Sequence, residues 1–135
     1  LNKFKNKIIG GAENLPFPDN SFDSVYCAFV WRNVNNPIKG IEEVYRILRP
    51  GGKFILLDMT RPKNKFLKLL HKIGTFKVTL LIGLLTFNLK EYRFLHKSLD
   101  KYPQPEEYFK THPFQYCKIQ RMGLFNFVYQ AVFEK

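Results

Sequence analysis

A strand–helix–strand pattern is the feature that most constrains how this chain can fold. Residues 22–30 form a β-branched and aromatic run after a turn-rich loop, which predicts a buried strand. Asn36 and Pro37 predict a helix start, because asparagine caps helices well and proline suits their first position. The Pro-Gly-Gly sequence at 50–52 predicts a turn that ends this helix, and residues 53–59 form a second apolar run. Two strands joined through one helix run parallel, so the pattern predicts an α/β fold.

The predicted helix between these strands carries one apolar face. Its apolar residues recur at the three- and four-residue spacing of an amphipathic helix. They are Ile38, Ile41, Val44, Tyr45 and Leu48. This face is expected to pack on the sheet.

The rest of the chain predicts more helices and then a hairpin. Residues 64–85 have a helical pattern in which Gly74 and Gly83 favour breaks. The uncharged stretch at 78–89 is shorter than the roughly 20 residues that span a bilayer. Further helical segments are expected at 91–101, before Pro103, and at 105–111. Residues 114–122 and 125–133 are strand-like runs around Gly123, which predicts an antiparallel pair.

Positive charge is concentrated in one segment of the chain. The 135 residues, enough for one domain, have a net charge of +11. Residues 61–101 hold ten lysines and arginines against Glu91 and Asp100, which leaves +8 in that segment. Lys65, Lys68 and Lys72 lie along one face of a helix that is otherwise rich in apolar residues. Such a helix either lies in an anionic membrane interface or packs with its lysines in water. Nucleic acid is not an expected partner, since no base-reading or stacking motif accompanies the charge.

The cysteines and histidines predict neither a disulfide framework nor a metal site. Cys27 and Cys117 are far apart in the sequence, which suits a reducing compartment. His71, His96 and His112 have no metal-ligand spacing with a cysteine or a carboxylate, so we expect them to be solvated or packed. The first residues lack an apolar signal core, and we expect a cytoplasmic protein.

Several motifs resemble one enzyme family. They are G-G-A-E-N-L-P-F-P-D-N-S-F-D-S-V at 10–25, W-R-N-V at 31–34 and R-I-L-R-P-G-G-K-F-I-L-L-D at 46–58. Together they resemble the second half of the catalytic domain of class I S-adenosylmethionine (SAM) dependent methyltransferases. The segment E-Y-R-F-L-H-K-S-L at 91–99 is similar to a Y-R-Y-L-x-x-S-I segment of the ubiquinone/menaquinone-biosynthesis C-methyltransferases. The resemblance covers nearly the whole chain and implies one partial domain, residues 1–135, formed by the C-terminal half.

The resemblance implies a partial Rossmann-like sheet. The family sheet has strand order 3-2-1-4-5-7-6, and the chain supplies strands 4, 5, 7 and 6 with their helices. The first strands and the Gly-rich SAM-binding loop have no counterpart in the sequence. Residues 7–9 would be a remnant of strand 3, and residues 1–10 are expected to be poorly anchored. The strand at 22–30 is expected to form an open edge that favours self-association or pairing with an N-terminal half.

The resemblance also assigns site residues. Gly11 and Ala12 correspond to the segment that lines the adenine of SAM, although Gly11 lacks the polar side chain that the family has there. Ala28 corresponds to a small residue that faces the cofactor. Arg32 and Asn33 match the Arg-Asn pair that follows the fourth strand. Arg32 is the main catalytic candidate, positioning the acceptor or a water; the alternative is a surface or helix-capping arginine.

The function implied by the resemblance is methyl transfer from SAM to a ring carbon of a polyprenyl phenol or naphthol. The partner is then a hydrophobic small molecule, and a position at the membrane surface would suit it. Two alternatives stay open: a methyltransferase acting on another small or lipid acceptor, and a non-catalytic half-domain that binds a membrane or a partner. Because part of the cofactor site has no counterpart, we expect the isolated chain to bind SAM very weakly.

Overall fold

The computed structural model describes residues 7–135, apart from the side chains of Glu91, Tyr92, Tyr108 and Phe125. It contains four strands, four α-helices and two short 3-10 helices within that range. In chain order these are β1 (Phe22–Ala28), η1 (Trp31–Asn33), α1 (Pro37–Ile47), β2 (Leu48–Met59), α2 (Lys65–Leu85), α3 (Leu89–Lys101), α4 (Pro105–Tyr108), β3 (Tyr116–Met122), η2 (Leu124–Asn126) and β4 (Val128–Glu134).

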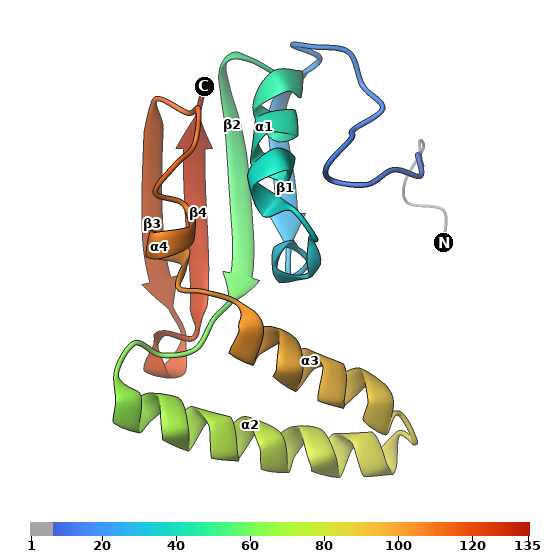
Figure 1. Cartoon of the computed structure of the whole chain (residues 1–135), viewed down its shortest axis with the longest axis vertical. Helices are drawn as coiled ribbons and strands as arrows, with labels where there is room; N and C mark the ends of the chain where they lie inside the picture. Colours follow the sequence, from blue (N-terminus) through green and yellow to red (C-terminus); the bar gives the residue numbers. More distant parts are fainter. Residues whose placement is uncertain (1–6) are drawn as a thin grey trace.

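The strands form one mixed sheet in the order β1-β2-β4-β3 (Figure 1). Strands β1 and β2 run parallel and are joined through α1, which confirms the predicted strand–helix–strand unit. Strand β4 pairs antiparallel with both β2 and β3, which confirms the predicted hairpin. The order is the one expected for strands 4, 5, 7 and 6 of the family sheet.

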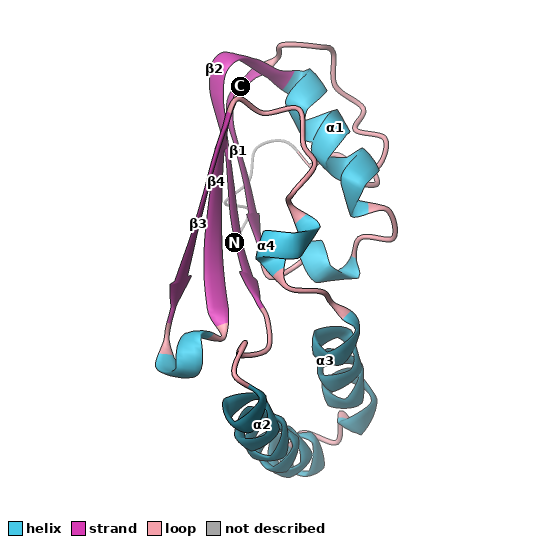
Figure 2. Cartoon of the chain, turned by 60° about the vertical axis from the view of Figure 1, so that its left-hand side comes forward, coloured by secondary structure: helices cyan, strands magenta, loops and turns pink. Residues whose placement is uncertain are grey.

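Only one face of this sheet is covered by helices within the described residues. Figure 2 shows α1 and α4 together on one side of the strands. On that side Phe54 of β2 and Phe133 of β4 stack with their ring centroids 5.5 Å apart, and Phe114 packs on both rings. On the other side Tyr26 of β1 is 72% exposed. One face is therefore a packed core, and the other presents apolar side chains without a helical layer.

Helices α2 and α3 form a long hairpin at one end of the sheet. Figure 1 places this hairpin beyond the carboxyl ends of the parallel strands β1 and β2. Helix α2 begins at an Asn64 cap, whose side chain accepts hydrogen bonds from the amides of Phe66 and Leu67. The helix is continuous through Gly74 and Gly83, so the predicted breaks are wrong. A single glycine costs a helix only about 1 kcal/mol relative to alanine, which contacts with a neighbouring helix can offset.

The strand–helix–strand unit differs from prediction at three points. Strand β1 ends at Ala28 rather than at residue 30, because Phe29 adopts a left-handed backbone with φ 59°. Helix α1 starts as predicted, with the Asn36 side chain accepting from the amide of Lys39, but Ile38 is exposed. The helix ends at Ile47 and β2 begins at once, so the Pro-Gly-Gly turn lies within β2. There Gly51 has φ 76°, and its amide donates to the last carbonyl of the chain.

The other predicted elements are confirmed with shifted bounds. The helix expected at 91–101 begins at Leu89, and the short helix expected at 105–111 ends at Tyr108. The strands of the hairpin begin at Tyr116 and Val128, later than expected. Residues 7–9 form no strand, and residues 1–6 of the segment expected to be poorly anchored lie outside the described residues.

Candidate functional site

Arg32 and Asp58 form a buried ion pair at the carboxyl ends of β1 and β2. The guanidinium of Arg32 pairs with Oδ1 of Asp58, and the backbone amide of Arg32 donates to Oδ2 at 2.9 Å. The side chains are 8% and 0% exposed. A charge this buried needs a partner, and each of these residues supplies it to the other. The alternative of a surface arginine at position 32 is therefore wrong.

Arg32 also connects the sheet to the helical hairpin. Its Nε lies 3.3 Å from the hydroxyl of Ser98 on α3, and its guanidinium donates to the carbonyl of Phe29 at 3.0 Å. Ser98 in turn donates to the carbonyl of Leu95. These contacts hold the arginine in one orientation between β1, β2 and α3.

A hollow of about 770 Å³ borders this arginine. Arg32 and Asn33 from η1 line one side, and Phe94, Lys97 and Tyr102 from α3 and its end line the other. The two residues predicted as catalytic thus share one opening with the helical hairpin. Crevices at the carboxyl ends of parallel strands are where α/β proteins bind ligands.

The predicted cofactor residues lie in two segments of the chain, residues 11–12 before β1 and Ala28 at its end. Gly11 pairs with Asn14 in an isolated β-bridge, and Ala12 lies beside Gly40 at the start of α1, close to the ring of Trp31. Residues 11–12, predicted to line the adenine, thus lie against α1, the helix that follows η1. Ala28 is exposed at the end of β1, where it pairs with Leu57 on the face of the sheet without helices.

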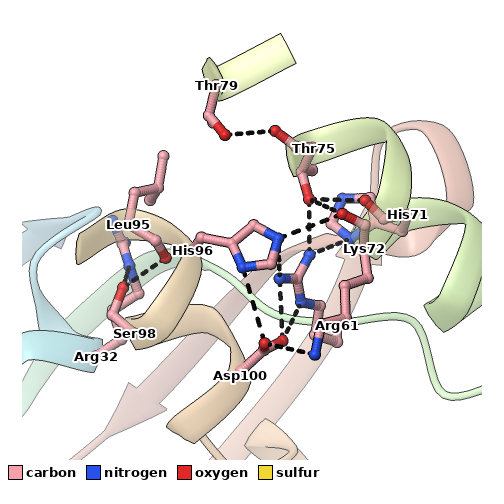
Figure 3. A network of polar contacts seen from close by, with 10 residues as sticks. All are labelled: Arg32, Arg61, His71, Lys72, Thr75, Thr79, Leu95, His96, Ser98 and Asp100. Carbon is pink, nitrogen blue, oxygen red and sulfur yellow. Dashed lines mark hydrogen bonds and ion pairs between the residues drawn. The ribbon is translucent and has the colours of Figure 1, made fainter. Parts of the chain in front are cut away.

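Sequence reasoning missed the partners of Arg32 and a second buried arginine. Figure 3 shows the guanidinium of Arg61 between α2 and α3, with dashed contacts to both helices. It donates to Oδ1 of Asp100 at 3.0 Å and to the hydroxyl of Thr75 at 2.9 Å. It also lies 3.2 Å from Nδ1 of His71 and 3.4 Å from Nε2 of His96. Arg61 is 2% exposed, so these contacts replace its solvation shell.

Charges and burial shift the pKa values in this network. Burial lowers the pKa of His71 below its ordinary value, and the nearby charges of Arg61 and His96 act in the same direction. Burial acts to raise the pKa of Asp100, but the hydrogen bond from Lys72 and the charge of Arg61 outweigh it and leave the pKa lowered. His71 is therefore held neutral and Asp100 charged near neutral pH.

A sequence signal for both arginine sites was present in D-M-T-R at 58–61. These polar residues follow an apolar strand, at the edge where ligands of α/β sheets bind. The local sequence pattern does not show, however, that Asp58 forms an ion pair with Arg32 or that Arg61 contacts α2 and α3. Those contacts span 26 and 39 residues of chain.

The thiols provide no reactive group at this site. Cys27 and Cys117 are free, and burial raises the pKa of Cys27, with the charge of Asp58 adding to the effect. No cluster of three histidine, cysteine or acidic side chains within the described residues could hold a metal ion. None of the described helices is both long and apolar enough to cross a bilayer.

Comparisons with known proteins agree on one family. Residues 5–127 match the model of the ubiE/COQ5 methyltransferase family. The chain is 41% identical over 111 residues to the ubiquinone/menaquinone biosynthesis C-methyltransferase UbiE of Rickettsia bellii, covering 80% of the chain and 45% of that protein. It is 36% identical over 102 residues to the mitochondrial 2-methoxy-6-polyprenyl-1,4-benzoquinol methylase of Bos taurus, covering 75% of the chain and 31% of that protein. The chain thus spans less than half the length of these relatives.

A solved structure supports the fold. A SAM-dependent methyltransferase of Thermotoga maritima, described as a possible histamine N-methyltransferase, superposes with a TM-score of 0.53 at 19% identity. The match covers 93% of this chain and 62% of that one, and it shows a shared Rossmann-like α/β architecture. With the family match over most of the chain, the conclusion is that this protein belongs to the ubiE/COQ5 methyltransferase family.

Proposed function

We propose that the chain forms the C-terminal half of a C-methyltransferase that acts on a polyprenyl quinone precursor. The observation that carries this proposal is the similarity to UbiE, named for ubiquinone/menaquinone biosynthesis, and to the bovine methylase, whose name states a polyprenyl benzoquinol. The helical hairpin, which lies beyond the carboxyl ends of β1 and β2 and exposes large apolar side chains, supports it, since a hydrophobic acceptor needs an apolar binding surface at that edge (Figure 1).

Arg32 is the residue we assign to positioning the reaction. Its guanidinium is held by Asp58 and by Ser98, so little conformational freedom is left to lose when an acceptor or a water binds beside it. A group held in place in this way contributes to rate by aligning the reacting atoms. Asn33 follows it in η1 and lines the same hollow.

The chain fits only part of a SAM molecule. Gly11 and Ala12 would border the adenine, and Ala28 would leave room near the end of β1 for the rest of the cofactor. Gly11 offers no side-chain hydrogen bond, and the sequence has no Gly-rich turn or second-strand acid for the other parts. SAM, the methyl donor, is therefore proposed to bind only when an N-terminal half completes the site.

A second part of the proposal is that the protein is peripheral at an anionic membrane surface. Large apolar side chains are exposed along the hairpin, with Phe87 at its turn 94% exposed. Lysines stand beside them, and Lys65, Lys68 and Lys77 are all exposed. Apolar contact with lipid and attraction to anionic headgroups would act together on such a surface.

Calorimetric titration with SAM tests the methyltransferase proposal. We expect very weak or no binding by residues 1–135 alone, and binding by a protein in which this chain is joined to the N-terminal half of the Rickettsia UbiE. The joined protein should then methylate a short-chain polyprenyl phenol, and Arg32→Ala should lower the rate while SAM binding stays intact. A folded joined protein that binds SAM but methylates only other acceptors supports the alternative of a methyltransferase acting on another small or lipid acceptor. One that binds no SAM supports a non-catalytic half-domain.

A further inference from the structure

An apolar cleft of about 300 Å³ lies where the helical hairpin meets the sheet. Its walls come from α2, α3, the end of β2 and the η2 turn. The apolar lining includes Met59, Leu70, Val78, Leu99 and Phe127. This volume is at the lower end of the range for small-molecule sites. The cleft begins at Met59, one residue after the Asp58 that holds Arg32.

The hydroxyl groups of the two threonines in the wall of the cleft are both hydrogen-bonded within the protein. The hydroxyl of Thr75 donates to the carbonyl of His71 at 2.7 Å and accepts from Arg61 at 2.9 Å. The hydroxyl of Thr79 donates to the carbonyl of Thr75 at 2.6 Å. Neither donor is left for a ligand.

Both ring nitrogens of His96, which also lines the cleft, face protein groups. Nδ1 lies 3.8 Å from the carboxylate of Asp100. Nε2 lies 3.2 Å from the carbonyl of Lys72 and 3.4 Å from the guanidinium of Arg61. Nε2 of His96 is thus occupied by protein groups, and Nδ1 faces the Asp100 carboxylate at more than hydrogen-bond distance (Figure 3).

In His71 one ring nitrogen is engaged by Arg61. An arginine can only donate, so Nδ1 of His71, 3.2 Å from the guanidinium of Arg61, must be the acceptor. The neutral ring then carries its proton on Nε2. No hydrogen bond to Nε2 is present within the described residues, and His71 as a residue is 9% exposed and packs on Phe127 with ring centroids 5.0 Å apart. The cleft therefore offers one free N–H donor in an apolar wall.

We propose that this cleft binds an apolar ring bearing an oxygen acceptor, and that Nε2–H of His71 donates a hydrogen bond to that oxygen. Arg61 fixes the tautomer that makes the donor available, in the way that a partner on one ring nitrogen sets the role of the other. Naming the ligand as the methyl acceptor rests on the proposed function, whereas the binding itself does not. A donor that the bound ligand covers selects for an acceptor, because an analogue without the oxygen removes the donor from water and leaves it unpaired.

A matched ligand pair tests the proposal with the full chain. 1-Tetralone and tetralin have nearly the same shape, but only 1-tetralone carries an acceptor oxygen. We expect His71→Phe to weaken 1-tetralone binding about 3- to 10-fold, as the loss of one neutral hydrogen bond predicts, and not to weaken tetralin binding, since tetralin makes no such bond. His112→Phe is the control, since His112 packs against Phe114 and Phe133 instead of lining the cleft, and it should change neither affinity.

Nitrogen NMR of the histidine rings gives a second measurement that needs no variant. In the wild-type chain 1-tetralone should shift the Nε2–H signal of His71, and tetralin should shift it much less. The proposal is overturned if both ligands leave that signal unchanged at saturation, if His71→Phe weakens both equally, or if neither binds. Failure here differs from failure of the proposed function: a joined protein could methylate a phenol whose affinity His71→Phe leaves unchanged. Conversely, the cleft could bind 1-tetralone in a protein that never binds SAM.

Discussion

The carboxylate of Asp58 accepts hydrogen bonds from both the backbone amide and the guanidinium of Arg32, a residue on the neighbouring chain segment after β1. The two residues come from the two parallel strand ends where α/β proteins place their ligands. The pair is buried, so it fixes the backbone of η1 as well as the arginine side chain. Arg32 is thus held through both its backbone and its side chain, and it lines the hollow at the strand ends.

Removing the arginine should therefore cost stability. We expect Arg32→Met to lower the free energy of unfolding by about 3 kcal/mol, because it leaves the Asp58 charge buried without its partner. Urea unfolding measures this. Arg49→Met is the matched control, since Arg49 pairs with Asp23 at an exposed site and should cost less than about 1 kcal/mol. Equal costs for the two variants would show that the buried pair contributes little, and adding Asp58→Asn to Arg32→Met should restore part of the loss.

Stability should also fall on mild acidification because of His71. Its folded-state pKa lies below the ordinary 6.5, so the unfolded chain takes up the proton first as pH falls. The contribution of neutral His71 to the free energy of unfolding is complete above about pH 6.5 and is lost as pH falls from there through the folded-state pKa. We expect His71→Asn to flatten the decline in unfolding free energy between about pH 7.5 and 5.5.

Glu106 supplies the control for that experiment. The hydrogen bond from Arg121 lowers the pKa of Glu106 to about 2, so its contribution is lost only as pH falls from 4.5 toward 2. Glu106→Gln should leave the decline between about pH 7.5 and 5.5 unchanged. If the unfolding free energy of His71→Asn declines with pH as steeply as that of the wild type, the pH dependence comes from other groups.

The helical hairpin should bind anionic vesicles and release them in salt. Exposed lysines and apolar side chains share its surface, and salt screens the attraction between lysines and lipid headgroups. We expect Lys68→Glu with Lys77→Glu to abolish cosedimentation with anionic vesicles. The control, Lys39→Glu with Lys118→Glu, makes the same charge change on α1 and β3, outside the hairpin, and should retain binding. Equal binding to neutral and anionic vesicles would contradict an electrostatic contribution.

Strand β1 should mediate self-association of residues 1–135. The amide of Phe29 bonds to the carbonyl of Leu57, so the alternate residues Ser24, Tyr26 and Ala28 direct their backbone groups to the open edge. Strand β3 is the other edge of the sheet. It carries the basic residues Lys118 and Arg121, which oppose edge-to-edge pairing, whereas β1 has no basic residue.

Light scattering after size exclusion measures this association. We expect the measured molar mass of the wild-type protein to rise with concentration, and Tyr26→Lys to suppress that rise. Gln120→Lys places the same charge on β3 and should have little effect. A wild-type chain that stays a cooperatively folding monomer at high concentration would show that its edge is closed in another way, and the description of it as a half-domain would fail.

The order of the elements could be predicted from the sequence because local signals carry it. Asn36 and Pro37 start a helix through their own side chains, and alternating or continuous apolar runs suit strands wherever they lie. The family motifs, which are contiguous stretches of residues, led to the same sheet order and to Arg32 and Asn33. Signals of this kind are weaker at boundaries, where Phe29 and Gly51 adopt left-handed backbones that depend on their neighbours in space.

The tertiary structure alone decided which polar groups meet. Arg32 lies far along the chain from its partners Asp58 and Ser98. Arg61 is likewise separated from His71 and Asp100, so no local pattern predicts these contacts. Burial makes each pairing specific, because a charge removed from water must find the partner that the fold brings to it. The free Nε2 of His71 is likewise a result of packing: it depends on Arg61 reaching the other side of the ring, from the loop that follows β2. The local sequence thus determined the elements and their order, and the fold determined the chemistry between them.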